Sequence, residues 1–154
     1  MPRSGADLAL LLLGGYRTLV DAAMQELADH GHPDFRPGHE FTMRAIEAGA
    51  RSASDVGRRT SVSKQAAAKT IAVLVERGYV AAEQDPDDAR RRRLTITPRG
   101  HEVLRLGEAA FEEHRARWER QIGAAELRTL EAHLAALVGD GAVDPGASAG
   151  EAYA

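Results

Sequence analysis

Residues 52–100 read SASDVGRRTSVSKQAAAKTIAVLVERGYVAAEQDPDDARRRRLTITPRG. Ser52 or Ser54 can cap a helix over residues 53–60, because a side-chain oxygen at either position can accept hydrogen bonds from the free amides of the first turn. A turn at residues 60–62 comes next, and a second helix begins directly after it. The stretch therefore predicts two helices joined by a tight turn and followed by a hairpin.

The second helix is predicted over residues 64–77, between an N-cap at Ser63 and a left-handed C-terminal cap at Gly78. This segment contains neither Gly nor Pro and is rich in Ala, the strongest helix former. Helical spacing predicts an inward stripe made of Val62, Ala66, Ala67, Thr70, Ile71, Leu74 and Val75. It leaves an outward face made of Lys64, Gln65, Ala68, Lys69 and Ala72.

The hairpin is predicted from two short runs at residues 79–83 and 94–97, which have the β-branched or alternating character of strands. Residues 85–88, Asp-Pro-Asp-Asp, are typical of a turn between them. Four consecutive arginines then lead into the return strand. Alternation along a strand sends the first and third of these to one side and the second and fourth to the other.

Asp88 stands two residues before Arg90 at the hairpin tip. A carboxylate and a guanidinium match as a bidentate pair, so Asp88 is predicted to accept hydrogen bonds from Arg90 and to hold the tip in shape. An arginine at a hairpin tip can enter a DNA minor groove, where narrow A·T-rich stretches concentrate negative potential. Alternation places Arg92 on the same side as Arg90.

Charge is distributed unevenly along the chain. Its net charge is −3, yet residues 58–100 carry ten Lys and Arg against five acidic residues, which leaves the remaining residues strongly acidic. A helix that leads into a major groove with its N-terminal end needs short side chains and hydrogen-bond donors there. Gln65 can bond adenine bidentately, and lysine can reach guanine or phosphate. The order of elements favours duplex DNA as the partner over the two alternatives, a solvated charge run and an ordinary Ala-rich surface helix.

Four motifs closely resemble the MarR-type winged helix-turn-helix regulators. They are Val-Ser-Lys-Gln-Ala at 62–66, Arg-Gly-Tyr-Val at 77–80, Asp-Pro-Asp-Asp-Ala-Arg at 85–90 and Thr-Pro-Arg-Gly at 97–100. The resemblance implies a dimer interlocked through its terminal helices, with each recognition helix in a major groove and each wing in the adjacent minor groove. The predicted DNA-binding residues are Ser63, Lys64, Gln65, Lys69, Thr70, Arg90 and Arg92, with Asp88 supporting the wing.

Two segments depart from the family pattern. The turn has Thr60-Ser61 where the family usually has Leu-Gly, so Ser61 is predicted to be slightly strained if it needs a positive φ. Residues 36–42 differ from the usual Leu-Thr-x-x-Gln entry to the preceding helix. This second departure concerns the ligand-sensing side of the fold rather than the DNA side.

The flanking segments predict helices with broad apolar stripes. Residues 7–29 place Leu and other apolar residues at helical spacing, and a long helix after Pro98 is interrupted at Gly123 and followed by a Leu seam. These stripes exceed what a small winged lobe can cover, so burial across a two-fold dimer axis is predicted in preference to an intramolecular bundle. The predicted fold class is mainly α (α+β). The predicted domains are a dimerisation helix at 1–32, the winged lobe at 33–100, dimerisation helices at 101–138 and a disordered tail at 139–154.

Other function classes find little support. The chain has no cysteine, and no Gly-rich phosphate loop, His-Glu-x-x-His motif or nucleophile elbow, so we expect neither an enzyme nor a cofactor. His30, His32 and His39 invite a metal hypothesis, but histidines on a Gly/Pro loop are more often solvated. With no targeting segment, the cytoplasm is the expected location, and no membrane partner is expected.

The sequence therefore favours a dimeric, DNA-binding transcriptional repressor. The alternative is a winged-helix module that binds proteins and no DNA, since fold does not dictate function. A small molecule bound between the dimerisation helices and the winged lobe is the expected switch. Candidate ligand-binding residues are Tyr16, His39, Phe41, His114 and Trp118, for which core packing is the competing interpretation.

Overall fold

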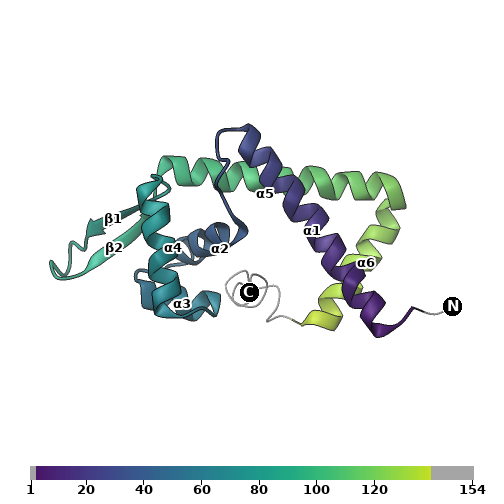
Figure 1. The fold of residues 1–154 in the computed structure, drawn as a ribbon, viewed down its shortest axis with the longest axis horizontal. Helices are drawn as coiled ribbons and strands as arrows, with labels where there is room; N and C mark the ends of the chain where they lie inside the picture. The colour runs from purple at the N-terminus through teal and green to yellow at the C-terminus, as the bar shows by residue number, and fades with distance from the viewer. Residues whose placement is uncertain (1–2, 140–154) are drawn as a thin grey trace.

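A long central helix joins two parts of the molecule in the computed structural model, which describes residues 3–139 (Figure 1). The elements are α1 (Gly5–Asp29), α2 (Pro37–Glu47), α3 (Ala53–Thr60), α4 (Lys64–Glu76), β1 (Val80–Gln84), β2 (Arg92–Ile96), α5 (Pro98–Ile122) and α6 (Ala124–Val138). The mainly helical fold with one antiparallel hairpin is confirmed. The tail predicted to be disordered lies, from residue 140 onward, outside the described residues.

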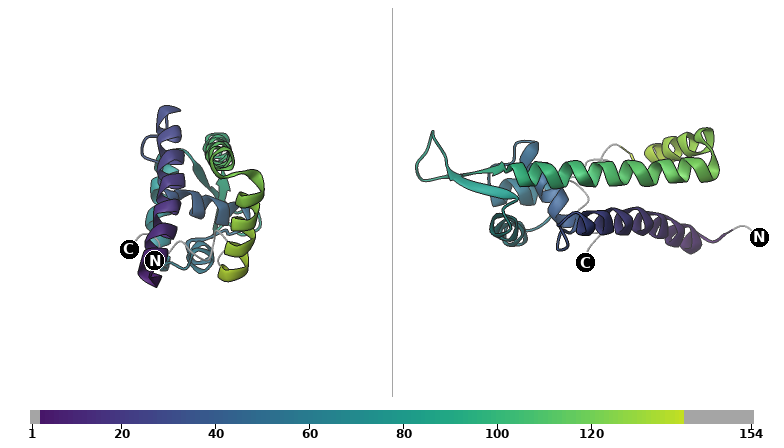
Figure 2. Two further views of the ribbon diagram at one scale, coloured as in Figure 1. Left: turned by 90° about the vertical axis from the view of Figure 1, so that its right-hand side faces the viewer. Right: turned by 90° about the horizontal axis from the view of Figure 1, so that it is seen from above.

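Helix α5 runs along the long axis of the molecule, with the hairpin projecting at one end and α6 folding back at the other (Figures 1 and 2). Helix α1 packs against α5, and its N-terminus points toward the α6 end. Helices α2, α3 and α4, together with the hairpin, form the winged lobe around the start of α5. The DNA-binding motif therefore sits at one end of the spine, and the terminal helices extend away from it.

The winged lobe has a closed apolar core of its own. Met43, Val56, Leu74 and Val103, from four different helices, are all fully buried in it. Burial of large apolar side chains stabilises such a core by about 1.5–3 kcal/mol each. The core fixes the positions of α3 and α4, so their outer faces are presented on a firm support.

The helix boundaries follow the sequence closely where local signals decide them. Ser52, rather than Ser54, caps α3, and its side chain accepts from the Asp55 amide at 3.2 Å. Ser63 caps α4 by accepting from the Ala66 amide at 3.1 Å. Gly78 has φ 77°, which confirms the predicted left-handed cap.

The inward stripe predicted for α4 needs correction at its two edges. Ala67, Ile71 and Leu74 are buried, as predicted. Ala66 and Val75 are exposed instead, because the apolar face that meets the core is narrower than helical spacing alone suggested. The helix therefore shows more of its circumference to solvent than predicted.

The base of the hairpin is tied to α5 by contacts that are distant in sequence. The Thr97 hydroxyl donates to the Gly78 carbonyl at 2.5 Å, and the Thr97 amide donates to the Tyr79 carbonyl at 3.1 Å. A Cβ on Gly100 would clash with the Tyr79 carbonyl oxygen and come within 2.7 Å of Ile96. The start of α5 and the base of the wing can approach this closely only because residue 100 is glycine.

The far end of the molecule leaves much of its apolar surface in solvent. Along α1, the exposed large side chains are Leu8, Leu10, Leu11, Leu12, Leu13 and Tyr16. On α6 only Leu127 is buried, and Leu137 is 83% exposed. Such contiguous apolar surface is typical of an interface rather than of a free surface.

Candidate nucleic-acid interface

The exposed edge of α4 carries the predicted reading residues. Lys64, Gln65 and Lys69 are all exposed and share the outward face with two alanines, so long polar side chains stand beside open space. Ser63 is exposed but uses its hydroxyl as the helix cap. Thr70 is half-buried and donates its hydroxyl to the Ala66 carbonyl at 3.2 Å. Within the described part of the chain, the donors left over on this edge are therefore those of the two lysines, the glutamine and the Ser63 hydroxyl, whose oxygen alone is used by the cap.

A tight turn fixes the N-terminus of α4 against α3. Ser61 adopts φ 55°, so the condition under which slight strain was expected at this position is met. The Val62 amide donates to the Gly57 carbonyl at 3.0 Å, and a Cβ on Gly57 would lie 2.8 Å from the Val62 carbonyl oxygen. The turn thus approaches α3 so closely that residue 57 must be glycine, and the positive end of α4 is left pointing outward.

The hairpin tip is held by a set of short-range hydrogen bonds. The Asp85 amide donates to the Arg91 carbonyl at 2.9 Å, and the Gln84 side chain donates to the Ala89 carbonyl at 3.0 Å. Strand β2 begins only at Arg92, opposite Gln84. Arg90 therefore belongs to the turn, and the predicted alternation of four arginines along a strand is wrong for the first two.

Asp88 contacts the tip differently from the predicted bidentate pair. Its Oδ1 accepts from the backbone amide of Arg90 at 3.0 Å, while its Oδ2 lies 3.5 Å from Nε of Arg91. The carboxylate still organises the turn, but through the backbone of one arginine and the side chain of the next. Arg90 is exposed, and its guanidinium takes part in none of the hydrogen bonds or ion pairs found among residues 3–139.

Arg92 lines a groove between the wing and the exposed face of α4. The groove has a volume of about 570 Å³ and is lined in part by Ala68, Ala72 and Leu94, with Arg51 on the opposite side from the wing. Arg51 stands just before the α3 cap, and sequence reasoning missed it because nothing local connects it to the wing. Its wall carries two arginines, Arg51 and Arg92, against one carboxylate, Glu76, so its charge remains positive and suits a strand of phosphates.

Asp55, an acidic residue near this surface, is paired with neighbouring groups. The Arg58 guanidinium forms an ion pair with Asp55 one turn away, and the Arg51 amide donates to Asp55 at 3.2 Å. The Arg51 amide hydrogen bond lowers the pKa of Asp55, with smaller contributions from Ser52 and Arg58. The carboxylate at the start of α3 is thus paired, and it adds little repulsion toward a polyanion.

The three histidines considered as metal ligands each contact a different group of the protein. His32 is buried and shares a 2.7 Å hydrogen bond between its Nδ1 and the Tyr79 hydroxyl, while His30 Nδ1 contacts the Glu26 carbonyl at 2.8 Å. His39 Nδ1 accepts from the Arg36 amide at 3.0 Å. Burial, with the nearby charges of Arg77 and Arg36, lowers the pKa of His39 to about 4. Within residues 3–139, His, Asp and Glu side chains form no cluster suited to a metal ion.

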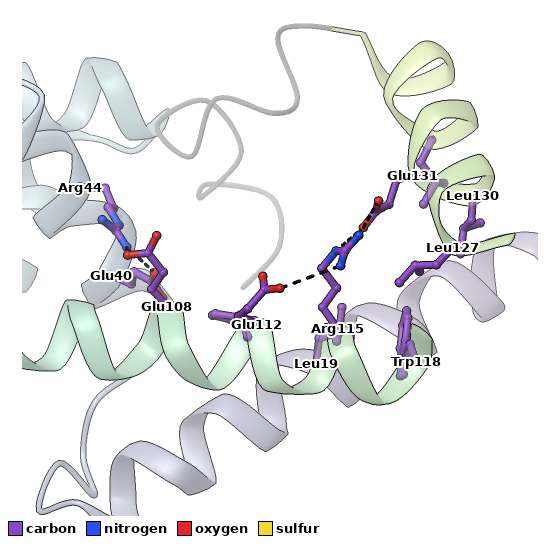
Figure 3. Close-up of a pocket in the computed structure, with 12 residues that line it drawn as sticks. Leu19, Glu40, Arg44, Glu108, Glu112, Arg115, Trp118, Leu127, Leu130 and Glu131 are labelled. Carbon is purple, nitrogen blue, oxygen red and sulfur yellow. Dashed lines mark hydrogen bonds and ion pairs between the residues drawn. The ribbon is translucent and has the colours of Figure 1, made fainter. Parts of the chain in front are cut away.

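A second cavity, of about 430 Å³, lies where α1, α2, α5 and α6 meet, and Figure 3 shows it in close-up. Of the predicted ligand-binding residues, Trp118 lines it. Tyr16, His39, Phe41 and His114 do not appear in its wall. The acidic and basic side chains of this wall, among them Glu40, Arg44 and Arg115, had no local signature in the sequence.

Comparison with known proteins identifies the winged lobe. Residues 42–91 match the model of the MarR family. An uncharacterized HTH-type transcriptional regulator of Staphylococcus aureus is 33% identical over 52 residues, which cover 34% of this chain and 36% of that protein. The match thus spans about a third of the length of that relative. No helix among the described residues is long and apolar enough to cross a membrane.

Solved structures share the fold over most of the chain. A mutant of S. aureus MepR bound to an oligodeoxyribonucleotide has a TM-score of 0.62 at 15% identity, covering 89% of this chain and 97% of that one. The MarR family protein Rv2887 of Mycobacterium tuberculosis, in complex with salicylic acid, has a TM-score of 0.62 at 21% identity, covering 88% and 97%. At these identities the likeness establishes the fold.

Proposed function

Since the chain carries a MarR-family winged helix-turn-helix over residues 42–91, we propose that it is a sequence-specific transcriptional regulator that binds double-stranded DNA as a homodimer in the cytoplasm. The observation that carries the proposal is the outward face of α4, where Lys64, Gln65 and Lys69 stand exposed beside alanines. Large apolar or aromatic anchors would instead favour a protein partner on that face.

In this proposal α4 enters the major groove and the wing reaches the adjacent minor groove. Gln65 reads a base edge, because an amide can bond adenine bidentately, and the two lysines contact guanine or phosphate. Arg90 reaches the minor groove from the tip of the wing. Two copies related by a two-fold axis would read a pseudo-palindromic operator with half-sites about 34–36 Å apart.

The homodimer is supported by the exposed leucines of α1 and α6, which need a second apolar surface. We propose that the regulator represses transcription and that a small molecule in the cavity around Trp118 releases it. The cavity touches helices of the winged lobe and of the terminal-helix end at once, so an occupant could change their relative position.

The test is mobility shift on duplex fragments from the gene's own genomic neighbourhood, at physiological salt. Specific binding predicts a shift at lower protein concentration than on random duplex of equal length. Gln65→Ala should relax base preference at one position per half-site by about 1–3 kcal/mol. Equal affinity for operator and random DNA would contradict the proposal and favour a protein-binding module.

A further inference from the structure

The cavity around Trp118 has an apolar floor and a charged rim. Its apolar lining residues are Leu19, Phe111, Trp118, Leu127, Leu130 and Leu134. A volume of about 430 Å³ lies within the usual range for small-molecule sites. The floor therefore suits the hydrophobic or aromatic part of a ligand. The charged side chains of the rim determine which ligand charge is favoured.

One of the two arginines on the rim is already saturated by carboxylates. Arg115 donates through Nε to Glu131 at 2.7 Å and through Nη2 to the other oxygen at 3.1 Å, a bidentate pair that joins α5 to α6. Its Nη1 lies 3.3 Å from Glu119 and 3.9 Å from Glu112. An anionic ligand would have to displace one of these carboxylates to reach the guanidinium.

The second arginine, at the winged-lobe end of the cavity, also faces three carboxylates, but it is paired more loosely than Arg115. Arg44 lies 3.7 Å from Glu40, 3.3 Å from Glu47 and 4.0 Å from Glu108. Figure 3 shows Arg44 with Glu40 and Glu108 at one point along α5, and Arg115 with Glu112 and Glu131 at another. Six carboxylates therefore surround two guanidinium groups.

The side chains that line the cavity carry more negative than positive charge. Glu40, Glu108, Glu112 and Glu131 line it together with only Arg44 and Arg115. The charge of Arg128 also acts on Glu131, but Arg128 is not in the wall. Burial raises the pKa of Glu40, the nearby Arg44 partly offsets this rise, and the charge of Glu108 adds to it. A positive ligand would add to the compensation that Arg44 supplies.

We propose that this cavity binds a lipophilic organic cation. The apolar body would lie on the leucine floor, and the positive centre would face the four carboxylates, which outnumber the two arginines of the wall. Trp118 adds a ring face that attracts a cation electrostatically. The inference rests on the proposed function only for the consequence of binding, because the preference for a cation follows from the cavity wall alone.

Trp118 is the only tryptophan in the chain, so its fluorescence reports on this cavity. The experiment titrates the full-length protein with tetraphenylphosphonium and, separately, with tetraphenylborate, which has nearly the same shape and the opposite charge. We expect saturable quenching by the cation, and binding of the anion at least about tenfold weaker. Equal affinities, or tighter binding of the anion, would overturn the proposal.

Glu131→Gln sharpens the test, because it removes a carboxylate and exposes the Arg115 guanidinium. It should weaken the cation severalfold and strengthen the anion. Glu113→Gln is the matched control, since Glu113 is exposed on α5, pairs with Arg117 and is not in the wall. It should leave both affinities unchanged. Circular dichroism checks that each variant is folded.

Two further outcomes separate this proposal from the function itself. If neither ion changes Trp118 emission, because side chains of a second copy fill the cavity, the cation site is refuted while DNA binding stands. If the cation binds but operator affinity is unchanged, the ligand class holds and the effector role fails. If the ligand-free protein does not recognise operator DNA, the proposed regulator function is refuted and the proposed cation site is unaffected.

Discussion

The winged lobe and the α1–α6 end treat their apolar residues in opposite ways. In the winged lobe Met43, Leu74 and Val103 are sealed inside, and long charged side chains such as Lys64 and Arg90 face solvent. At the other end the leucines at residues 8 and 10–13 are 43–66% exposed. One region completes its core within a single chain, whereas the other presents a surface that a second apolar surface must cover.

The two regions owe their stability to different contacts. An isolated helix of about 15 residues is marginal in water, so α6, with Leu127 as its one buried side chain, gains little from its own chain. The winged lobe gains its order from buried contacts and from the packing of the wing base on α5. We therefore expect changes in the lobe to act on folding and changes in α1 or α6 to act on association.

The largest effect is expected for Gly100→Ala in the winged lobe. Alanine is the better helix former by about 1 kcal/mol, which by itself would stabilise α5. The added Cβ would clash with the Tyr79 carbonyl, a backbone atom that cannot swing away, which places the cost at the upper end of the about 1–3 kcal/mol typical of overpacking. Urea denaturation should show a loss of about 2 kcal/mol.

Gly38→Ala is the matched control, because a Cβ there meets nothing within 4 Å and the residue lies in the first turn of α2. It should leave the free energy of unfolding unchanged or slightly raised. A Gly100→Ala protein as stable as the parent would show that the wing base can move away from α5, and that the lobe is less rigid than its core indicates.

The second prediction concerns the exposed end. Leu137→Glu should leave the winged lobe folded but weaken self-association, because Leu137 is 83% exposed in one chain, and the change puts a charge into the proposed interface and removes up to about 1.5–3 kcal/mol of apolar burial per copy. Sedimentation equilibrium should show the dissociation constant raised at least about tenfold.

Ala132→Glu introduces the same charge on the opposite side of α6, where Ala132 is exposed, and should not change the mass distribution. A parent protein that sediments as a monomer would remove the contrast altogether, since the exposed leucines would then have no second copy to cover them.

Sequence could predict what adjacent residues decide. Ser63, Gly78 and Ser61 mark helix ends and a turn through local hydrogen bonds and backbone preferences, and all three act as expected. The apolar stripe of α1 was also evident from its spacing. Its spacing could not reveal that Val20, Ala23 and Leu27 are buried within the chain while the leucines before them are exposed.

What sequence missed depends on residues far apart in the chain. Gly100 is constrained by Tyr79, and Arg51 reaches the wing groove only because α3 packs beside α4. The partner of Asp88 differed because hydrogen bonds across the turn, not alternation, decide where β2 begins. The cavity around Trp118 draws its wall from four helices, so no single segment could indicate its charge.

A third, smaller effect is expected from acid. The pKa of His39 is about 4 in the folded protein, mainly because of burial, and about 6.5 when unfolded. The unfolded state therefore binds more protons between these values, and the stability contributed by neutral His39 is full above pH 6.5 and is lost as the pH falls toward 4. Allowing for partial exposure, moving from pH 7 to pH 5 should cost about 1 kcal/mol at this site.

Position 39 is the third residue of α2. A glutamine side chain there can accept the hydrogen bond from the Arg36 amide, as His39 does, but it does not titrate. His39→Gln should therefore unfold in urea with a smaller loss between pH 7 and pH 5 than the parent. His32, whose pKa is also lowered, chiefly by burial, contributes equally to both proteins and cancels in the comparison. Identical losses would place the acid sensitivity outside the α2 end of the lobe.

The smallest effect is expected on the DNA-facing surface, where a side chain contributes to binding and little to folding. Arg90 is exposed at the turn, and Asp88 holds its backbone rather than its guanidinium. Arg90→Ala should leave the urea midpoint unchanged. It should weaken operator binding and flatten its salt dependence by about 0.9 per lost phosphate contact, or about 1.8 for a dimer, because fewer counterions are released.

Fluorescence anisotropy over a series of salt concentrations measures this slope. Arg120→Ala on the last turn of α5 makes the same change in net charge at the opposite end of the molecule and should keep the parental slope. Arg91→Ala separates support of the turn from contact with DNA. Because Arg91 pairs with Asp88, its loss should loosen the turn more than it changes the salt slope. Equal slopes for Arg90→Ala and Arg120→Ala would mean that the wing acts only through the overall charge of the protein, and that the specific part of the interface is confined to α4.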